Sequence, residues 1–181
     1  PDIQLWASPW SPPVWMKDNK HYACQPLDTT FFDNIGQNGI QPEQIRREGM
    51  NMFIQEDAYF KSYALYFKKF IEAYRKEGIR IFMVMPQNEF NSCQPFPSCT
   101  WLASGLATFV GRYLGPAMQE VGVDLMFGTM ERPNPVLVDT LLTDPLSRNY
   151  ISGVGFQWAG KKAVGDIHKR YSNLKIYQTE Q

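Results

Sequence analysis

The sequence lacks several features that would tie a protein to common partners. Eighteen basic residues balance eighteen acidic ones, so the formal net charge is zero, which argues against nucleic acid or an anionic membrane as the main partner. No run approaches the ~18 apolar residues that a membrane span needs. No glycine-rich phosphate loop, G-x-G-x-x-G or G-x-x-x-x-G-K, follows an expected strand, which disfavours a cofactor-dependent α/β enzyme.

Cysteine and histidine are also scarce, with three and two residues. No C-x-x-C or H-x-x-x-H spacing indicates a metal site, so we expect neither a metal nor a cofactor. Cys93 and Cys99 flank a Pro-rich loop, CQPFPSC, and could pair, which would leave Cys24 as the odd one out. Neither His21 nor His168 accompanies a nucleophilic Ser or Cys in a known elbow, which disfavours triad chemistry.

Five apolar runs have the length of strands and are nearly continuous, as is typical of strands buried on both faces. They are residues 3–8, 80–85, 123–128, 151–158 and 174–178. Three- and four-residue spacing of apolar residues predicts helices between them, over residues 56–77, 100–120, 134–148 and 160–171. Gly78 and Gly122 are expected to end the first two helices. The glycines of Gly-Val-Gly at 153–155 lie inside a strand and indicate tight packing.

This alternation predicts a parallel sheet with helical crossovers, either doubly wound or part of a (β/α)8 barrel. Active sites in such folds lie where the strands end. Polar residues and indoles follow the strands here, at Ser8, Trp10, Trp15, Gln87, Asn88, Glu89, Thr129, Glu131, Arg132, Gln157, Trp158, Thr179 and Glu180. The stretch 11–55 is a long connection, and so long a connection is usually functional.

Two glutamates on one rim, Glu89 and Glu180, suit acetal chemistry. One carboxylic acid protonates the leaving oxygen, and the other, ionised, attacks the anomeric carbon or activates water. Each glutamate taken alone is more often a loop charge, and the default interpretation of Trp10 and Trp158 is that they are core aromatics. The pair, together with nearby indoles and amides, therefore predicts a carbohydrate as the partner.

Four segments carry a family resemblance: ASPWSPPVWMK at 7–17, MPQNEF at 85–90, LLTDPLSRNYISGVGFQW at 141–158 and YQTEQ at 177–181. In order and spacing they resemble the glucosylceramidase-like enzymes of glycoside hydrolase family 30, over essentially the whole chain. The resemblance implies a partial TIM (β/α)8 barrel of about five parallel strands, the third to seventh of the barrel, with flanking helices. Residues 1–181 would then be an incomplete (β/α)8 catalytic domain, an excerpt of a longer chain.

The same resemblance implies a retaining β-glycosidase that hydrolyses β-linked glucosides or related glycans by double displacement, with its two carboxyl groups ~5–5.5 Å apart. Glu89 would be the acid/base and Glu180 the nucleophile. The residues that bind the sugar would be Trp10, Asn88, Gln157 and Trp158, with Asn88 on the 2-hydroxyl. Family habit alone implies a secreted or periplasmic protein.

Three positions depart from the family pattern, and the first is Gln157, where a histidine is common. Ala159 stands where a tyrosine is common, and Phe90 replaces the usual proline after the acid/base. These changes leave the two-carboxylate chemistry intact but make a ceramide-type substrate less expected. The rival interpretation is a non-catalytic carbohydrate-binding protein on the same scaffold, which the intact pair of glutamates disfavours.

Overall fold

The computed structural model describes residues 3–28, 30 and 37–181. The strands of this part form one parallel sheet of five strands, in the order β1-β2-β3-β4-β5. They are β1 (Leu5–Ala7), β2 (Ile81–Val84), β3 (Asp124–Met130), β4 (Ile151–Gln157) and β5 (Lys175–Glu180). Each overlaps one of the five runs expected from the sequence, so those predictions are confirmed. Spatial order equals chain order, as in a (β/α)8 barrel.

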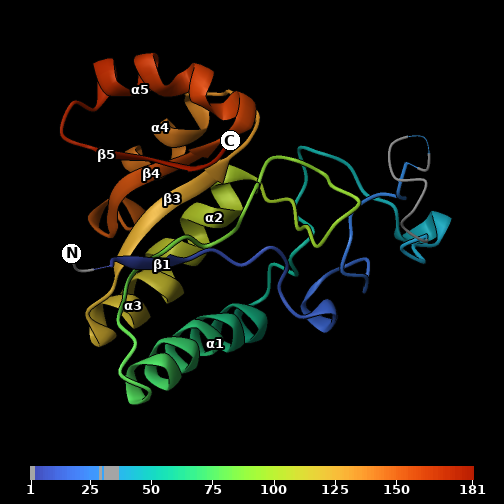
Figure 1. Cartoon of the computed structure of the whole chain (residues 1–181), viewed down its shortest axis with the longest axis horizontal. Coiled ribbons are helices and arrows are strands. Elements are labelled where there is room, and N and C mark those ends of the chain that lie inside the picture. The colour runs from blue at the N-terminus through green and yellow to red at the C-terminus, as the bar shows by residue number, and fades with distance from the viewer. Residues whose placement is uncertain (1–2, 29, 31–36) are drawn as a thin grey trace.

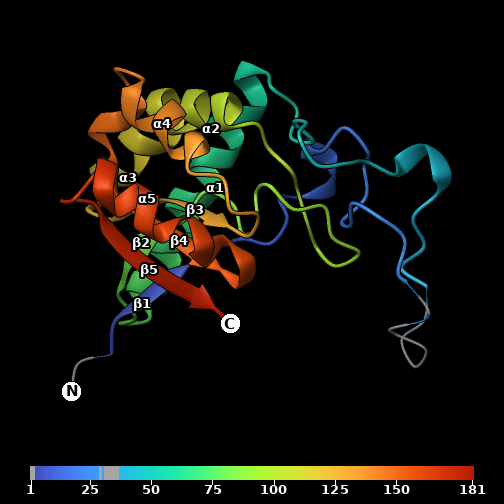
Figure 2. The same ribbon diagram turned by 90° about the horizontal axis from the view of Figure 1, so that it is seen from above.

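The sheet curls into a half-barrel (Figure 2). Neighbouring strands lie about 4.8 Å apart, so β1 and β5 would be roughly 19 Å apart in a flat sheet. Instead, Trp6 of β1 and Tyr177 of β5 bring their ring centroids to 5.8 Å. Inside the curl lies a small cluster of buried methionines, at Met83, Met85 and Met126. The fold prediction of a partial barrel is therefore confirmed.

Helices cover the outer face of the curl (Figures 1 and 2). The α-helices are α1 (Asp57–Lys76), α2 (Ala103–Phe109), α3 (Gly115–Val121), α4 (Val136–Thr143) and α5 (Val164–Arg170). The apolar stripe of α1 is buried at Phe60, Tyr63, Ala64, Phe67 and Ile71. Gly78 and Gly122 follow α1 and α3 with φ of +75° and +66°, which confirms both as helix ends.

Three of the four expected helices are interrupted, with a local cause in two of them. The helix expected over 100–120 contains a π-helical turn, Val110–Leu114, between α2 and α3. Pro116 follows this turn and has no N–H for the regular ladder. The helix expected over 134–148 ends as α4 because Asp144 precedes Pro145 and adopts an extended conformation. A short 3-10 turn, Trp158–Ala163, precedes α5.

The two glycines expected to mark tight packing in β4 do so. A Cβ atom on Gly153 would lie 2.3 Å from Met126 Cε and 2.5 Å from a backbone oxygen of β5. A Cβ atom on Gly155 would lie 2.8 Å from Met85 Sδ. Side chains at positions 153 and 155 would therefore displace the methionines that fill the curl.

The described part of the stretch 11–55 is packed against the domain, although residues 29 and 31–36 lie outside the described part. Lys17 and Phe53 form an antiparallel bridge, and the Phe53 ring stacks on Trp101 at 4.6 Å. Figures 1 and 2 both place this stretch beside the connection from β2 to α2, past the carboxyl ends of the strands. Among the described residues, no helix has the length and apolar character needed to cross a bilayer.

Candidate active site

A cleft of about 330 Å³ opens at the rim where the strands end. Its walls are Trp10, Asn88, Glu89, Gln94, Phe96, Pro97, Ser98, Glu131, Trp158 and Glu180. These residues follow β1, β2, β3 and β4 or end β5. The rim expected to hold the site therefore does hold a cleft, and both glutamates singled out in the sequence are part of it.

The backbone around Glu89 holds its side chain in place. Glu89 has φ of +47°, a left-handed conformation that costs a non-glycine residue about 1–3 kcal/mol. Its N–H donates to Thr129 Oγ1 at 2.8 Å. Asn88 N donates to Pro9 O at 2.9 Å and Thr129 N donates to Gln87 O at 2.7 Å. The connection that follows β1 and the end of β3 thus hold the strained turn from both sides.

The surroundings of Glu89 favour its protonated form. Burial raises the pKa of this carboxyl, and the negative charges of Glu131 and Glu180 raise it further. Hydrogen bonds from Gln157 and Gln94 lower the pKa, but the net direction is upward. A carboxyl that keeps its proton closer to neutral pH is suited to act as a general acid.

Glu180 ends β5, opposite Gln157 of β4 in the register of the sheet. The side-chain amide of Gln157 links β4 and β5 to Glu89. Thr179 Oγ1 donates to Gln157 Oε1 at 2.9 Å, and Gln157 Nε2 donates to Glu89 Oε1 at 2.7 Å. Gln157 is fully buried. It therefore fixes Glu89 from behind and is not part of the cleft wall.

The other predicted sugar-binding residues do line the cleft. Asn88 is 6% exposed, and its Oδ1 accepts a hydrogen bond from Thr129 Oγ1 at 3.1 Å, which sets the orientation of the amide. Trp10 and Trp158 are 45% and 47% exposed. The default expectation that these two tryptophans are core aromatics is wrong, because both are about half-exposed and line the cleft.

Sequence reasoning left two parts of the cleft without a role. Glu131 was placed on the rim only as a residue that follows β3, yet it is a cleft residue and is 7% exposed. The segment 94–98 also lines the cleft, although it was considered only as a loop between cysteines. An acidic residue directly after a buried strand was the available signal for Glu131.

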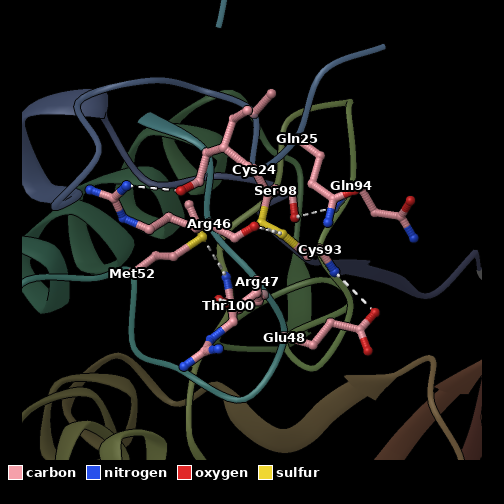
Figure 3. The surroundings of a disulfide bond; sticks show 12 residues. Cys24, Gln25, Arg46, Arg47, Glu48, Met52, Cys93, Gln94, Ser98 and Thr100 are labelled. Atoms are coloured by element: carbon pink, nitrogen blue, oxygen red, sulfur yellow. Dashed lines mark hydrogen bonds between the residues drawn. A yellow bond between two sulfur atoms is a disulfide. The ribbon is translucent and has the colours of Figure 1, made fainter. Parts of the chain in front are cut away.

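The cysteine pairing considered from the sequence is wrong. Cys24 pairs with Cys93, with Cα atoms 5.3 Å apart, as Figure 3 shows, and Cys99 is free and buried. The loop turns its two cysteines to different surroundings. Cys93 Sγ lies 3.2 Å from Arg46 O, while burial raises the pKa of Cys99 to about 12. The loop 11–55 supplies the partner of Cys93, and spacing along the chain does not reveal that approach.

The disulfide belongs to a set of contacts that brace the cleft wall at 94–98. Cys24 N donates to Gln94 O at 2.9 Å, and Ser98 N donates to Tyr22 O at 3.0 Å. The buried Lys17 Nζ donates to Ser98 O at 2.6 Å, and burial lowers the pKa of this ammonium to about 8. The long connection therefore supports the cleft from behind.

A curled parallel sheet with an acidic cleft at the carboxyl ends of its strands is the architecture of (β/α)8-barrel enzymes. The chain belongs to glycosyl hydrolase family 30, whose TIM-barrel domain it matches over residues 42–181. Both the family and the barrel expected from the sequence are thus confirmed.

Several relatives of this chain are named as glucosylceramidases or endo-1,6-β-glucanases. It is 26% identical over 191 residues to the lysosomal acid glucosylceramidase of Mus musculus, covering 98% of this chain and 33% of that protein. It is 30% identical over 187 residues to an endo-1,6-β-D-glucanase of Neurospora crassa, covering 99% and 34%. A solved endo-β1,6-glucanase has a TM-score of 0.70 at 24% identity, covering 99% of this chain and 37% of that one. The chain thus spans about a third of the length of these relatives.

Proposed function

We propose that this chain carries the catalytic centre of a retaining β-glycosidase. The observation that carries the proposal is the position of Glu89 and Glu180, which reach the walls of one cleft from β2 and β5. Burial and acidic neighbours raise the pKa of Glu89, which suits this carboxyl to the role of the acid. A second carboxyl group in the same cleft is what the nucleophile requires.

In the first step, Glu89 donates its proton to the glycosidic oxygen while a Glu180 oxygen attacks the anomeric carbon. The bond between that carbon and the leaving oxygen breaks, the leaving group departs as an alcohol, and a glycosyl ester forms on Glu180. Glu89 is then an ionised base. The amide of Gln157, at 2.7 Å from Glu89 Oε1, can stabilise that anion.

In the second step, Glu89 removes a proton from water, whose oxygen attacks the anomeric carbon and displaces Glu180. Two inversions at the same carbon give net retention. The amide of Asn88 lies on the cleft wall next to Glu89 and would donate to the sugar 2-hydroxyl. The exposed faces of Trp10 and Trp158 would stack against the apolar faces of the sugar ring.

We propose a β-linked glucoside as the substrate. The relatives named a glucosylceramidase and an endo-1,6-β-glucanase support glucose as the reacting sugar. Two half-exposed indoles on the cleft wall supply apolar stacking surface of the kind that a sugar ring needs.

The test uses the full-length protein with an aryl β-glucoside, followed by proton NMR of the first sugar released. The β-anomer should appear first, because double displacement retains configuration. Glu180→Gln should abolish turnover. Glu89→Ala should slow substrates with poor leaving groups far more than activated aryl glucosides, since activated leaving groups need little protonation.

Glu77→Gln is a matched control, because Glu77 is exposed at the end of α1 and lies outside the cleft. It should leave all these rates unchanged. Early appearance of the α-anomer, or an equal loss on both substrate types in Glu89→Ala, would contradict the proposal. Sugar binding without any turnover would favour the non-catalytic rival.

We also propose that the protein works in a secretory or periplasmic compartment. The bond between Cys24 and Cys93 supports this, because structural disulfides persist in oxidising environments. Thiol labelling of the protein as isolated from its native source should modify none of the cysteines unless the protein is denatured, and only Cys99 afterwards. Labelling of all three after denaturation would contradict the proposal.

A further inference from the structure

Glu131 is a third carboxylate of the cleft, and the double displacement leaves it without a role. It comes directly after β3 and lines the cleft together with Glu89 and Glu180. Only 9% of its side chain is exposed. A charged group buried to this degree is costly unless each of its oxygens has a partner.

Among the described residues, neither side-chain oxygen of Glu131 accepts a hydrogen bond, and Oε2 alone is part of an ion pair. Oε2 is sealed from solvent and lies 2.6 Å from Arg132 Nη1, an ion pair whose angles are not those of a hydrogen bond. The same guanidinium is held by Glu48, through Nε at 2.9 Å and Nη2 at 2.8 Å. Within the described part of the chain, no hydrogen bond reaches Glu131 Oε1. That oxygen belongs to a side chain on the cleft wall.

The backbone of Glu131 is fixed to the turn that carries the proton donor. Asn91 Oδ1 accepts from Glu131 N at 3.1 Å and from Arg132 N at 3.2 Å. Asn91 Nδ2 donates to Arg132 O at 2.9 Å. Because Asn91 lies two positions after Glu89, these bonds fix the position of Glu131 relative to Glu89. An acceptor held in place in this way needs no ordering when a ligand binds.

The position of Glu131 indicates which part of a substrate it would meet. β3 is hydrogen-bonded to β2, which leads to Glu89, whereas Glu180 ends β5 two strands away. Glu131 is therefore nearer to the proton donor than to the nucleophile, and the proton donor faces the leaving group.

We propose that Glu131 determines specificity by accepting a hydrogen bond from a hydroxyl of the leaving-group sugar. This rests on the proposed function, because the leaving-group side is defined by Glu89 acting as the acid. A carboxylate accepts strong hydrogen bonds from hydroxyls, and a site built to bond a hydroxyl rejects a leaving group that lacks one.

The experiment compares two glucosides with the full-length protein, by glucose release. One is a β-1,6-linked glucose disaccharide, and the other is methyl β-glucoside. Both leaving alcohols need protonation, but only the disaccharide has ring hydroxyls on the leaving side. Glu131→Ala should lower kcat/KM for the disaccharide by about 10- to 100-fold, the value of one hydrogen bond to a charged group. The loss on methyl β-glucoside should stay within about threefold.

Glu131→Gln keeps an acceptor oxygen without the charge, so its loss on the disaccharide should be intermediate. It also decides the question if Glu131→Ala does not fold, which thermal unfolding detects. Glu77→Ala removes an exposed charge outside the cleft and should change neither substrate. An equal loss on both substrates would overturn the proposal in favour of a structural role for Glu131. No loss on either would overturn it because Glu131 would then make no contact.

Failure of the proposed function has a different signature, because the unaltered protein would then hydrolyse neither substrate. In that case, calorimetric titration with a β-1,6-linked glucose trisaccharide decides. Weaker binding by Glu131→Ala than by the unaltered protein would support sugar recognition by Glu131. Equal binding would overturn it.

Discussion

Removal of the bond between Cys24 and Cys93 should destabilise the protein by about 4 kcal/mol. The perturbation is the double variant Cys24→Ala/Cys93→Ala in the full-length protein. The two cysteines are 69 residues apart, and the chain-entropy relation gives roughly 4.4 kcal/mol for a closed loop of that length. This value describes freedom returned to the unfolded chain, and residual structure in that chain would reduce it.

The cleft wall at 94–98 should keep part of its native structure in this double variant. Hydrogen bonds from Cys24 N to Gln94 O, Ser98 N to Tyr22 O and Lys17 Nζ to Ser98 O do not need the sulfur atoms. The loss should therefore appear mainly as a lower midpoint in urea unfolding. The slope of the transition should rise, because an unfolded chain without a cross-link exposes more surface.

Cys99→Ala is the matched control, because this thiol is buried but unpaired. It should lower the free energy of unfolding by about 1–2 kcal/mol, mainly through lost packing, with no change in slope. A loss below about 1 kcal/mol in the double variant, or a loss equal to that of the control, would refute the reasoning from loop closure. The double variant should also raise KM, because the segment 94–98 that the disulfide braces is part of the cleft wall.

Other predictions concern the proton donor and two glycines. Because the pKa of Glu89 is raised in the folded protein, kcat/KM should fall at a pH above the ordinary range of carboxyl groups. Above that pH the ionisation of Glu89 opposes folding. Glu89→Gln should therefore raise the melting temperature at neutral pH. Glu131→Gln should move the alkaline limb of the pH profile of kcat/KM to lower pH, because it removes a negative charge near Glu89. Gln157→Leu should move this limb to higher pH, because it removes a hydrogen bond that stabilises the Glu89 anion. An unmoved limb would show that Glu89 does not govern it. Gly160→Ala should destabilise by about 1–3 kcal/mol, because its Cβ would lie 2.0 Å from a backbone oxygen, whereas Gly165→Ala, in α5 with nothing within 4 Å, should stabilise by about 0.5–1 kcal/mol in thermal unfolding.

The layers of the fold could be predicted because strands buried on both faces leave continuous apolar runs, as at 80–85 and 151–158. The interruptions of the helices could have been expected from Pro116 and Pro145, which break the hydrogen-bond ladder where they stand. The 3-10 turn before α5 has no proline, and no local signal announced it.

The candidate site was only partly predictable. Glu89 and Glu180 could be found because each ends an apolar run, and sheet topology then brings such ends together. Gln157 was expected to bind the sugar, and its bond to Glu89 Oε1 and its full burial could not be read from the sequence. The bond from Cys24 to Cys93 depends on the path of the loop 11–55, and that path is set by tertiary contacts such as the bridge between Lys17 and Phe53.

The curl of the sheet, which brings Trp6 to Tyr177, also sets the geometry of the active site. Glu89 lies in the turn that follows β2 and Glu180 ends β5, so the distance between their carboxyl groups depends on how tightly the sheet curls. Methionine thioethers and the bare backbone of Gly155 occupy the inside of that curl. A methyl group added or removed among these methionines would change the curl of the sheet, and with it the distance between the two carboxyl groups.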